Sequence, residues 1–311
     1  MHISRRNTRR RALKLIGGAT ALLAMPELGT TAAASAGMLK RPIPRSGELL
    51  PAVGLGTWQT FDVGPGDAAR AELREVLRQL PALGGSVVDS SPMYGESERV
   101  VGDLTAELGI RDRLFFATKV WTSGREAGIR QMETSFRLMR TKRMDLMQVH
   151  NLLDLGHHLP TLREWKAAGK IRYLGITHYH SGAYGELERL VKTREYDFVQ
   201  FNYSMDEREA EARLLPLCGD SGTAVLVNRP FSQAGLFGKV RGKPLPPWAQ
   251  ELDCASWAQF FLKYILSHPA VTCVIPGTRR VAHLKDNLQA GVGRLPDAAL
   301  RRRMVEHLQS L

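Results

Sequence analysis

Four polar residues of different chemical types follow apolar, strand-like runs in the first half of the chain. Asp89 ends VVD, Lys119 stands near the end of FFATKV, His150 ends MDLMQVH, and Tyr94 follows Asp89 by five residues. An unperturbed tyrosine has a pKa of about 10, and a nearby ammonium group lowers it. These residue types could therefore protonate a carbonyl oxygen.

Each residue has a separate expected role in that chemistry. Tyr94 would be the general acid, and Lys119 would lower the pKa of its phenol. Asp89 would keep Lys119 protonated and correctly oriented. His150 would donate a hydrogen bond to the substrate oxygen.

The sequence offers no group to attack the carbonyl carbon. It contains no activated-serine motif, and His150 has no partner His or Cys at the spacing of metal ligands, so no metal is predicted. A hydride from a bound nicotinamide would complete the reaction. A barrel glycosidase that uses Asp89 and Glu96 as paired carboxylates is an alternative, although a lysine has no evident part in that chemistry.

These residues need a scaffold that brings three strand ends to one rim. Helix-like segments follow each of eight strand-like segments, which lie at residues 52–57, 86–91, 113–120, 144–151, 173–179, 198–204, 223–231 and 271–278. Such a series predicts a (β/α)8 TIM barrel, here preceded by a short hairpin turning at Ser46 and Gly47. A doubly wound open sheet is the alternative, but no G-x-G-x-x-G follows the first strand.

The remaining helix-like patterns complete that series. They lie at residues 67–84, 97–109, 129–140, 159–170, 184–195, 206–222, 254–269 and 281–291. Parallel strands joined by helices are buried on both faces, and eight such units can close without leaving a sheet edge. The carboxyl ends of the strands are then the expected location of a site.

Composition and charge point to a soluble globular chain with a separate leader. Of 311 residues, 43% are hydrophobic and 24% are charged, which is ordinary for such a protein. Residues 1–36 contribute +5 of the net charge of +12. With no interleaving of basic and aromatic residues, a nucleic-acid partner is not expected.

The leader has the three parts of an export signal: a basic start, an apolar run from Leu15 to Met25, and small residues up to Ala36. The segment TRRRALK, residues 8–14, resembles a bacterial twin-arginine signal. It implies export machinery as a partner and a periplasmic or secreted location. The apolar run is too short for a stable membrane anchor, and residues 37–311 remain for the barrel. A basic tail that stays inside, or an uncleaved anchor, is the alternative.

Three segments together resemble the aldo-keto reductase family: VVDSSPMYG, FFATKVW and LMQVHN, in that order. The resemblance covers about residues 40–290 and implies NAD(P)H-dependent reduction of an aldehyde or ketone. It assigns the catalytic roles to Asp89, Tyr94, Lys119 and His150. A non-catalytic, nicotinamide-binding redox-sensing or regulatory subunit on the same fold is the alternative.

The resemblance also implies a set of cofactor-binding and substrate-binding residues. Thr177 and Gln200 would bind the nicotinamide carboxamide, with His178 where the family more commonly has Asn. The expected set continues with Gly56, Thr57, Asn228, Arg229, Pro230 and Phe231, then Thr278, Arg279 and Arg280 for the phosphates, and Asp286 and Asn287 for the adenine. Trp58 and Trp121 would form walls of the pocket for a small carbonyl substrate.

The choice between the two nicotinamide cofactors depends on a few basic positions. The Arg279-Arg280 pair favours NADPH over NADH. Two family positions that are often basic for the 2′-phosphate are Gly277 and His283 here. NADPH is therefore the preferred cofactor, with NADH as the alternative.

Overall fold

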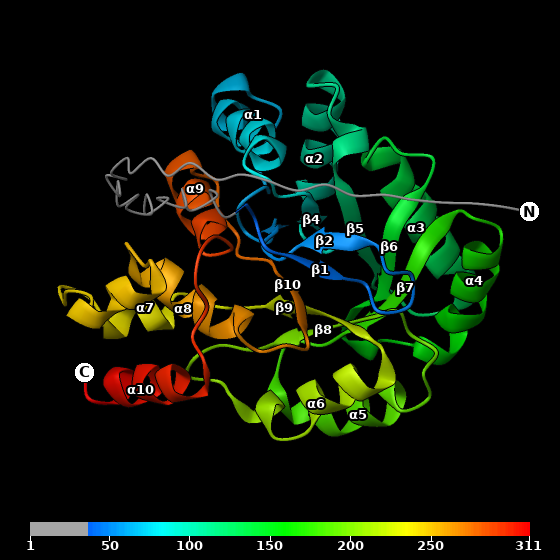
Figure 1. The fold of residues 1–311 in the computed structure, drawn as a ribbon. Helices are drawn as coiled ribbons and strands as arrows, with labels where there is room; N and C mark the ends of the chain where they lie inside the picture. Colours follow the sequence, from blue (N-terminus) through cyan, green and yellow to red (C-terminus); the bar gives the residue numbers. More distant parts are fainter. Residues whose placement is uncertain (1–36) are drawn as a thin grey trace, which may run out of the picture. The chain divides into compact units, whose positions relative to one another are not determined.

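The computed structural model describes residues 37–311, and Figure 1 shows their arrangement. The predicted export signal, including TRRRALK, lies outside the described residues. Within them, no helix is both long and apolar enough to cross a membrane.

Eight parallel strands form one sheet in chain order. They are β3 (Leu55–Gly56), β4 (Val87–Asp89), β5 (Phe115–Val120), β6 (Met144–Val149), β7 (Ile171–Thr177), β8 (Phe198–Asn202), β9 (Ala224–Asn228) and β10 (Val271–Val274). Each strand pairs with its sequence neighbour. Parallel bridges from Val53 to Val274 and from Gly56 to Gly277 join the first strand to the last. The predicted barrel is confirmed, and the open-sheet alternative is wrong.

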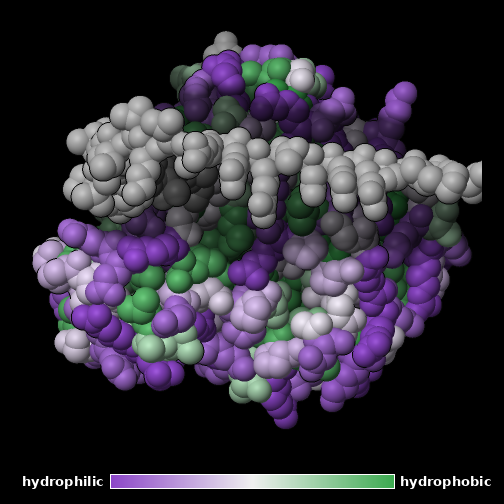
Figure 2. Space-filling model, in the orientation of Figure 1, coloured by the Kyte–Doolittle hydropathy of each residue, from purple (hydrophilic) through white to green (hydrophobic). Residues whose placement is uncertain are grey.

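Helices surround this barrel on the outside. They are α1 (Asp67–Ala82), α2 (Ser97–Glu107), α3 (Arg125–Leu138), α4 (Leu155–Ala167), α5 (Tyr184–Val191), α6 (Leu214–Ser221), α8 (Trp257–Leu266) and α9 (Val281–Gln289). In α1, Leu73, Val76, Leu77 and Leu80 recur at helical spacing, and all four are buried. Hydrophilic residues predominate on the visible surface over α4 and α5 (Figure 2). The apolar faces therefore cover the sheet, and the polar faces meet solvent.

Three helical segments differ from the expectation. The helix predicted over 206–222 consists of a short 3-10 turn, Glu209–Glu211, and then α6, because Arg213 takes an extended φ of −145° that interrupts it. The short α7 (Gly235–Lys239) and the C-terminal α10 (Ala298–Gln309) were not predicted. Met304, Val305 and Leu308 of α10 are buried, so this helix belongs to the packed body.

The N-terminal hairpin lies at the amino end of the barrel. It pairs β1 (Lys40–Pro42) antiparallel with β2 (Leu49–Pro51), as expected from the turn residues between them. Ile43 and Leu50 are buried in one apolar cluster with Phe115 and Phe198, the first residues of β5 and β8. The hairpin therefore covers the barrel interior opposite the expected site.

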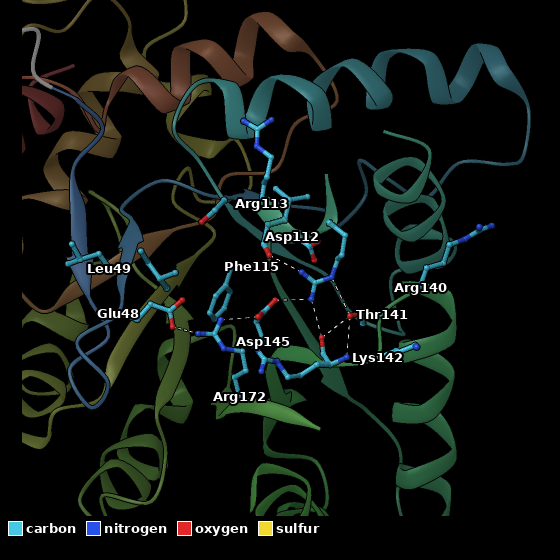
Figure 3. Close-up of a pocket in the computed structure, with 15 residues that line it drawn as sticks. Glu48, Leu49, Asp112, Arg113, Phe115, Arg140, Thr141, Lys142, Asp145 and Arg172 are labelled. Atoms are coloured by element: carbon cyan, nitrogen blue, oxygen red, sulfur yellow. Dashed lines mark hydrogen bonds and ion pairs between the residues drawn. The ribbon is translucent and has the colours of Figure 1, made fainter. Parts of the chain in front are cut away.

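A polar cavity of about 560 Å³ also lies at this amino end, between the hairpin and the loops before β5 and β6. A chain of ion pairs runs from Glu48 through Arg172 and Asp145 to Arg111 (Figure 3). The other labelled cations, Arg113, Arg140 and Lys142, point away from this chain in Figure 3 rather than toward a common centre. These ion pairs link the hairpin to the barrel. In the labelled part of this cavity, the remaining cationic side chains do not point toward one position where they could bind an anion together.

Candidate active site

Asp89 and Lys119 form a buried ion pair at the carboxyl ends of β4 and β5. The Lys119 ammonium donates to Asp89 Oδ2 at 2.7 Å and to the carbonyl of Ser90 at 2.7 Å. Burial by itself lowers the pKa of Lys119, but the charge of Asp89 and the neighbouring Tyr94 outweigh it and raise that pKa above its ordinary value. Lys119 therefore remains a cation, as the sequence analysis expected.

Tyr94 comes from the loop after β4, and its ring faces this lysine. Lys119 Nζ lies 5.1 Å from the centre of the ring. Burial raises the pKa of Tyr94, and the Lys119 ammonium lowers it without cancelling the effect of burial. Lys119 therefore acts on this pKa in the expected direction, but burial outweighs it, and the phenol is protonated at neutral pH.

His150, after β6, lies beside the tyrosine as a neutral ring. The two ring centres are 5.9 Å apart and meet edge to face. Burial, together with the positive charge of Lys119, lowers the pKa of His150 to about 2. A neutral imidazole keeps only one N–H, so its tautomer decides what it can donate.

Ser91 forms a hydrogen bond with one nitrogen of that ring and was not predicted. Its Oγ lies 3.0 Å from His150 Nδ1 and accepts a bond from the backbone N–H of Met93. When the serine hydroxyl is the donor to Nδ1, the single ring proton of His150 lies on Nε2. The only sequence signal was the position of Ser91, two residues after Asp89 in the same strand-end segment.

A row of hydrogen bonds continues across the strand ends from Asp89. Gln200 Nε2 donates to Asp89 Oδ1 at 2.9 Å, and Gln148 Nε2 donates to the same oxygen at 3.2 Å. Thr177 donates to Gln200 Oε1 at 3.1 Å. The amide of Gln200 is therefore held in one orientation by the group that also holds Lys119.

These residues lie in or beneath a cleft of about 1180 Å³, which is larger than most single-ligand pockets. Most predicted residues line it: Thr57, Trp58, Asp89, Tyr94, Trp121, His150, Thr177, Gln200, Asn228, Arg229, Pro230, Phe231, Thr278, Asp286 and Asn287. The elements that carry them range from β3 to α9. The sequence analysis therefore located one continuous cleft.

Five predicted residues are not among those that line the cleft. Lys119 is buried behind Tyr94 and Asp89. Gly56 lies at the seam of the barrel, where a Cβ atom would come within 2.7 Å of the carbonyl oxygen of Ile275. The ring of His178 accepts a bond from the N–H of Tyr179 and packs on the neighbouring rings. Arg279 and Arg280 are exposed just before α9.

The segment after β9 forms one wall of the cleft in an unusual backbone conformation. Arg229, Ser232, Gln233 and Ala234 all have positive φ angles, between 49° and 74°, which non-glycine residues seldom adopt. Asp206 holds this segment, because it accepts from Ser232 Oγ and forms an ion pair with Lys239. The contacts of Asp206 therefore hold this segment in its unfavourable backbone conformation.

At the far end of the cleft, two predicted residues already have partners. Asp286 accepts from Ser256 Oγ at 2.8 Å and from Gln259 Nε2 at 2.7 Å. Thr278 Oγ1 accepts from the backbone N–H of Arg280 at 3.1 Å. These hydrogen bonds therefore fix the N-terminal part of α9 and the segment just before it.

Several cleft residues were missed by the sequence analysis: Gln59, Thr60, Met93, Asn151, Tyr179, Gln233, Ala234, Phe237, Ser256, Trp257, Ala258 and Ile275. Most stand one to three residues from a predicted residue and share its loop. Phe237 and Trp257 come from α7 and α8, where no motif marked them. Glu96 does not line the cleft. It is exposed and paired with Arg99 at 2.8 Å, so the carboxylate pair of a glycosidase is not formed.

The fold and the site together define an α/β barrel with a tyrosine, lysine, aspartate and histidine at the carboxyl ends of its strands. The described residues hold no cluster of side chains suited to a metal. The family model named "Aldo/keto reductase family" matches residues 52–303, and the chain belongs to that family.

Curated relatives and solved structures agree with this membership. Methylglyoxal reductase YeaE of Escherichia coli is 30% identical over 80% of this chain and 89% of its own length. The NADH-specific methylglyoxal reductase of E. coli is 27% identical over 68% and 73%. The crystal structure of an aldo/keto reductase from Klebsiella pneumoniae in complex with NADP and acetate has a TM-score of 0.72 and 26% identity, covering 84% of this chain and 93% of that one.

Proposed function

We propose that the protein reduces an aldehyde or ketone to the alcohol with NADPH, with Tyr94 as the general acid. The observation that carries this proposal is the contact of the buried Lys119 ammonium with Asp89 on one side and the Tyr94 ring on the other. A raised tyrosine pKa keeps the acid protonated before reaction. The fixed ammonium would then stabilise the phenolate as the proton leaves.

The other polar groups position the substrate oxygen. His150, neutral and with its proton on Nε2, donates a hydrogen bond beside Tyr94. Both donors thereby face the oxygen on which negative charge develops. When bound, the nicotinamide would supply the hydride to the carbonyl carbon.

The residues present fit a nicotinamide dinucleotide. Asn228 Oδ1 and Asn151 Oδ1 are buried, have no hydrogen-bond partner and belong to cleft-lining residues, so each is available to a polar ligand. Thr177 and Gln200 present an ordered pair of hydrogen-bonding groups for a carboxamide. Arg279 and Arg280 are exposed at the start of α9 and form no ion pair within residues 37–311, so both charges are available to the additional 2′-phosphate that distinguishes NADPH from NADH.

A fluorescence titration and a turnover assay test the proposal together. The purified protein should bind NADPH more tightly than NADH. It should oxidise NADPH in the presence of small aldehydes. Tyr94→Phe should retain NADPH binding and lose at least about a thousandfold in kcat, since a positioned acid and its electrostatic support are both lost. Tight NADPH binding with no turnover on any carbonyl would instead support a non-catalytic, nicotinamide-binding subunit.

We also propose that residues 1–36 direct export by the twin-arginine route, on the basis of TRRRALK and the apolar run that follows. The full-length chain, expressed in a bacterium with that route, should be recovered in the periplasmic fraction. The double substitution Arg9→Lys and Arg10→Lys should leave it in the cytoplasm. Equal distribution of both forms would refute export by this route.

A further inference from the structure

The acid turn, residues 92–96, carries the proposed general acid and is anchored at both of its ends. Before it, Thr57 Oγ1 donates to Ser90 Oγ at 3.0 Å. After it, Glu98 in the first turn of α2 is buried and accepts from Thr118 Oγ1 of β5. The path of the acid turn between these anchors depends on the contacts that its own backbone makes.

One side chain from another loop reaches that backbone. The carboxylate of Asp62 accepts from the backbone N–H of Glu96 at 2.9 Å. It also lies against Gly95, where φ is 58° and where an added Cβ atom would collide with the carboxylate. Within residues 37–311, no other side chain from a different loop, strand or helix bonds to the backbone of the acid turn.

Asp62 stands on a loop that is itself ordered. The backbone N–H groups of Thr60 and Phe61 both donate to the carbonyl of Thr57, at 3.1 and 3.0 Å. The Phe61 ring, one residue before Asp62, is buried in the core. The backbone N–H of Thr57 in turn donates to the carbonyl of Asp89. The carboxylate of Asp62 is therefore fixed relative to the carboxyl end of β4.

The bond from Asp62 also caps a helix from outside it. Glu96 is the residue before α2, and its own side chain makes no capping hydrogen bond. The first N–H groups of a helix lack partners within the helix, and a negative charge near them is stabilised by the helix dipole. Asp62 therefore stabilises the acid turn and the start of α2 in one defined arrangement.

We propose that Asp62 is a positioning residue for the reaction, which holds the acid turn in place and so keeps the phenol of Tyr94 against the Lys119 ammonium. This inference rests on the proposed function and extends it to a residue outside the cleft. Asp62 does not line the cleft, so its effect on the reaction passes through the backbone of Gly95 and Glu96.

Substitutions of Asp62 measure this role in steady-state kinetics. Asp62 is exposed, so the variants should fold. Asp62→Ala should lower kcat by about tenfold and leave the NADPH dissociation constant unchanged, because the acid is displaced and the cofactor contacts are not. Asp62→Asn keeps an oxygen that can accept from Glu96 and should restore most of the rate. A native kcat in Asp62→Ala would overturn the proposal.

Asp297→Ala is the matched control for these variants. Asp297 is also exposed and accepts from a backbone N–H just inside a helix, that of Leu300 at 2.8 Å, but at the start of α10. It should retain the native kcat. A loss equal to that of Asp62→Ala would contradict the proposal, because removal of any helix cap would then have the same effect.

A double-mutant cycle with Tyr94→Phe connects the loss of rate to the acid itself. In Tyr94→Phe there is no acid to position, so adding Asp62→Ala should lower the residual rate little further. The residual rate is measured at high enzyme concentration. A tenfold loss in both backgrounds would contradict the proposal, since Asp62 would then act on some other part of the site.

Fluorine-19 NMR separates this inference from the proposed reaction, because it needs no turnover. The chain has seven tyrosines, and after labelling with 3-fluorotyrosine the resonance that is absent in Tyr94→Phe belongs to Tyr94. This resonance should be single and narrow in the native protein and Asp62→Asn, and broadened or split in Asp62→Ala.

The two measurements together give distinguishable outcomes. If no aldehyde is reduced but the Tyr94 resonance changes as expected, the proposed function fails and the positioning role of Asp62 stands. If aldehydes are reduced but the resonance and kcat are the same in the native protein and Asp62→Ala, the positioning role fails and the function stands.

Discussion

The buried ammonium of Lys119 sets the electrostatics of the site at the scale of single residues. Asp89→Asn keeps an oxygen to accept from Gln148 and Gln200 but removes the counter-charge of Lys119. We expect it to lower the free energy of unfolding by about 3 kcal/mol, since an unpaired buried charge is left behind. Urea denaturation of the purified variant measures the loss.

The double variant Asp89→Asn with Lys119→Met separates stability from catalysis. Removing both charges should restore most of the lost unfolding free energy, because two neutral groups replace the unpaired charge. Activity should stay low, since the proposed mechanism needs the ammonium to stabilise the Tyr94 phenolate. If the double variant were no more stable than Asp89→Asn alone, the ion pair would not be the cause of the loss.

In the proposed reaction, Ser91 would act through the imidazole of His150, with which it forms a hydrogen bond. Ser91→Ala removes the partner of His150 Nδ1 and should let the ring adopt both tautomers, lowering kcat/KM by about tenfold. Nitrogen-15 NMR of the ring should show a proton appearing on Nδ1. NADPH affinity should not change. A ring that stays protonated only on Nε2 in the variant would assign tautomer control to another group.

Three of the proposed catalytic residues were predictable in position because they end strands, whereas the net direction of the Tyr94 pKa shift was not. Asp89, Lys119 and His150 each follow an apolar run, and parallel strands must bring such positions to one rim. How deeply the Tyr94 hydroxyl is buried depends on packing from loops distant in sequence. That depth determines whether burial or Lys119 prevails, and no local pattern encodes it.

At the scale of elements, closure of the barrel depends on the close approach of β3 to the segment after β10. Gly56 lies at this seam, and its N–H donates to the carbonyl of Pro276. Gly56→Ala would place a Cβ atom 2.7 Å from the carbonyl oxygen of Ile275, so one backbone must move. We expect a loss of about 1–3 kcal/mol in unfolding free energy, measured by chemical denaturation.

Gly64→Ala provides the comparison for that substitution. A Cβ atom at Gly64 meets nothing within 4 Å, so the same chemical change should have little effect on stability there. Similar losses at both glycines would show that the seam is not the cause, because the reduced entropy of the unfolded chain should favour alanine at either position. The seam gives Gly56 a structural role in closing the barrel, and its contact with the cofactor stays a prediction.

Sequence patterns located most elements, and the misses have physical causes. The pattern over 206–222 is helical in spacing, but the interruption at Arg213 is a backbone conformation that side-chain periodicity does not report. In α10, three consecutive arginines at positions 301–303 interrupt the apolar pattern in the sequence, although Met304, Val305 and Leu308 form a buried apolar face. Arg301 itself contacts Glu211 and Tyr203, so part of this basic run serves packing.

At the scale of the whole molecule, counting strand and helix units was sufficient to predict closure. The bridges from Val53 to Val274 and from Gly56 to Gly277 close the sheet of eight parallel strands, so it has no free edge. The closed barrel places residues as distant in sequence as Thr57 and Asn287 around one cleft. The aromatic content of that cleft could not be counted in advance. Phe237 and Trp257 reach it only through the path of the chain after β9.

The buried histidine also links global stability to pH. His150 has a pKa of about 2 when folded and about 6.5 when unfolded, so below pH 6.5 the unfolded chain binds a proton that the folded protein does not. Stability is therefore complete above pH 6.5 and falls as the pH decreases toward 2. Between pH 7.5 and 5.5 this group alone should remove about 1.4 kcal/mol of unfolding free energy.

The difference between two variants isolates that contribution, because the other titrating groups cancel. His150→Gln should lose about 1.4 kcal/mol less than the native protein on going from pH 7.5 to 5.5, since it has no ring to protonate in either state. If the unfolding free energies of the native protein and of His150→Gln changed with pH in the same way, the folded protein would bind a proton at His150 as readily as the unfolded chain. The neutral hydrogen-bond donor proposed beside Tyr94 would then be absent near pH 5.5.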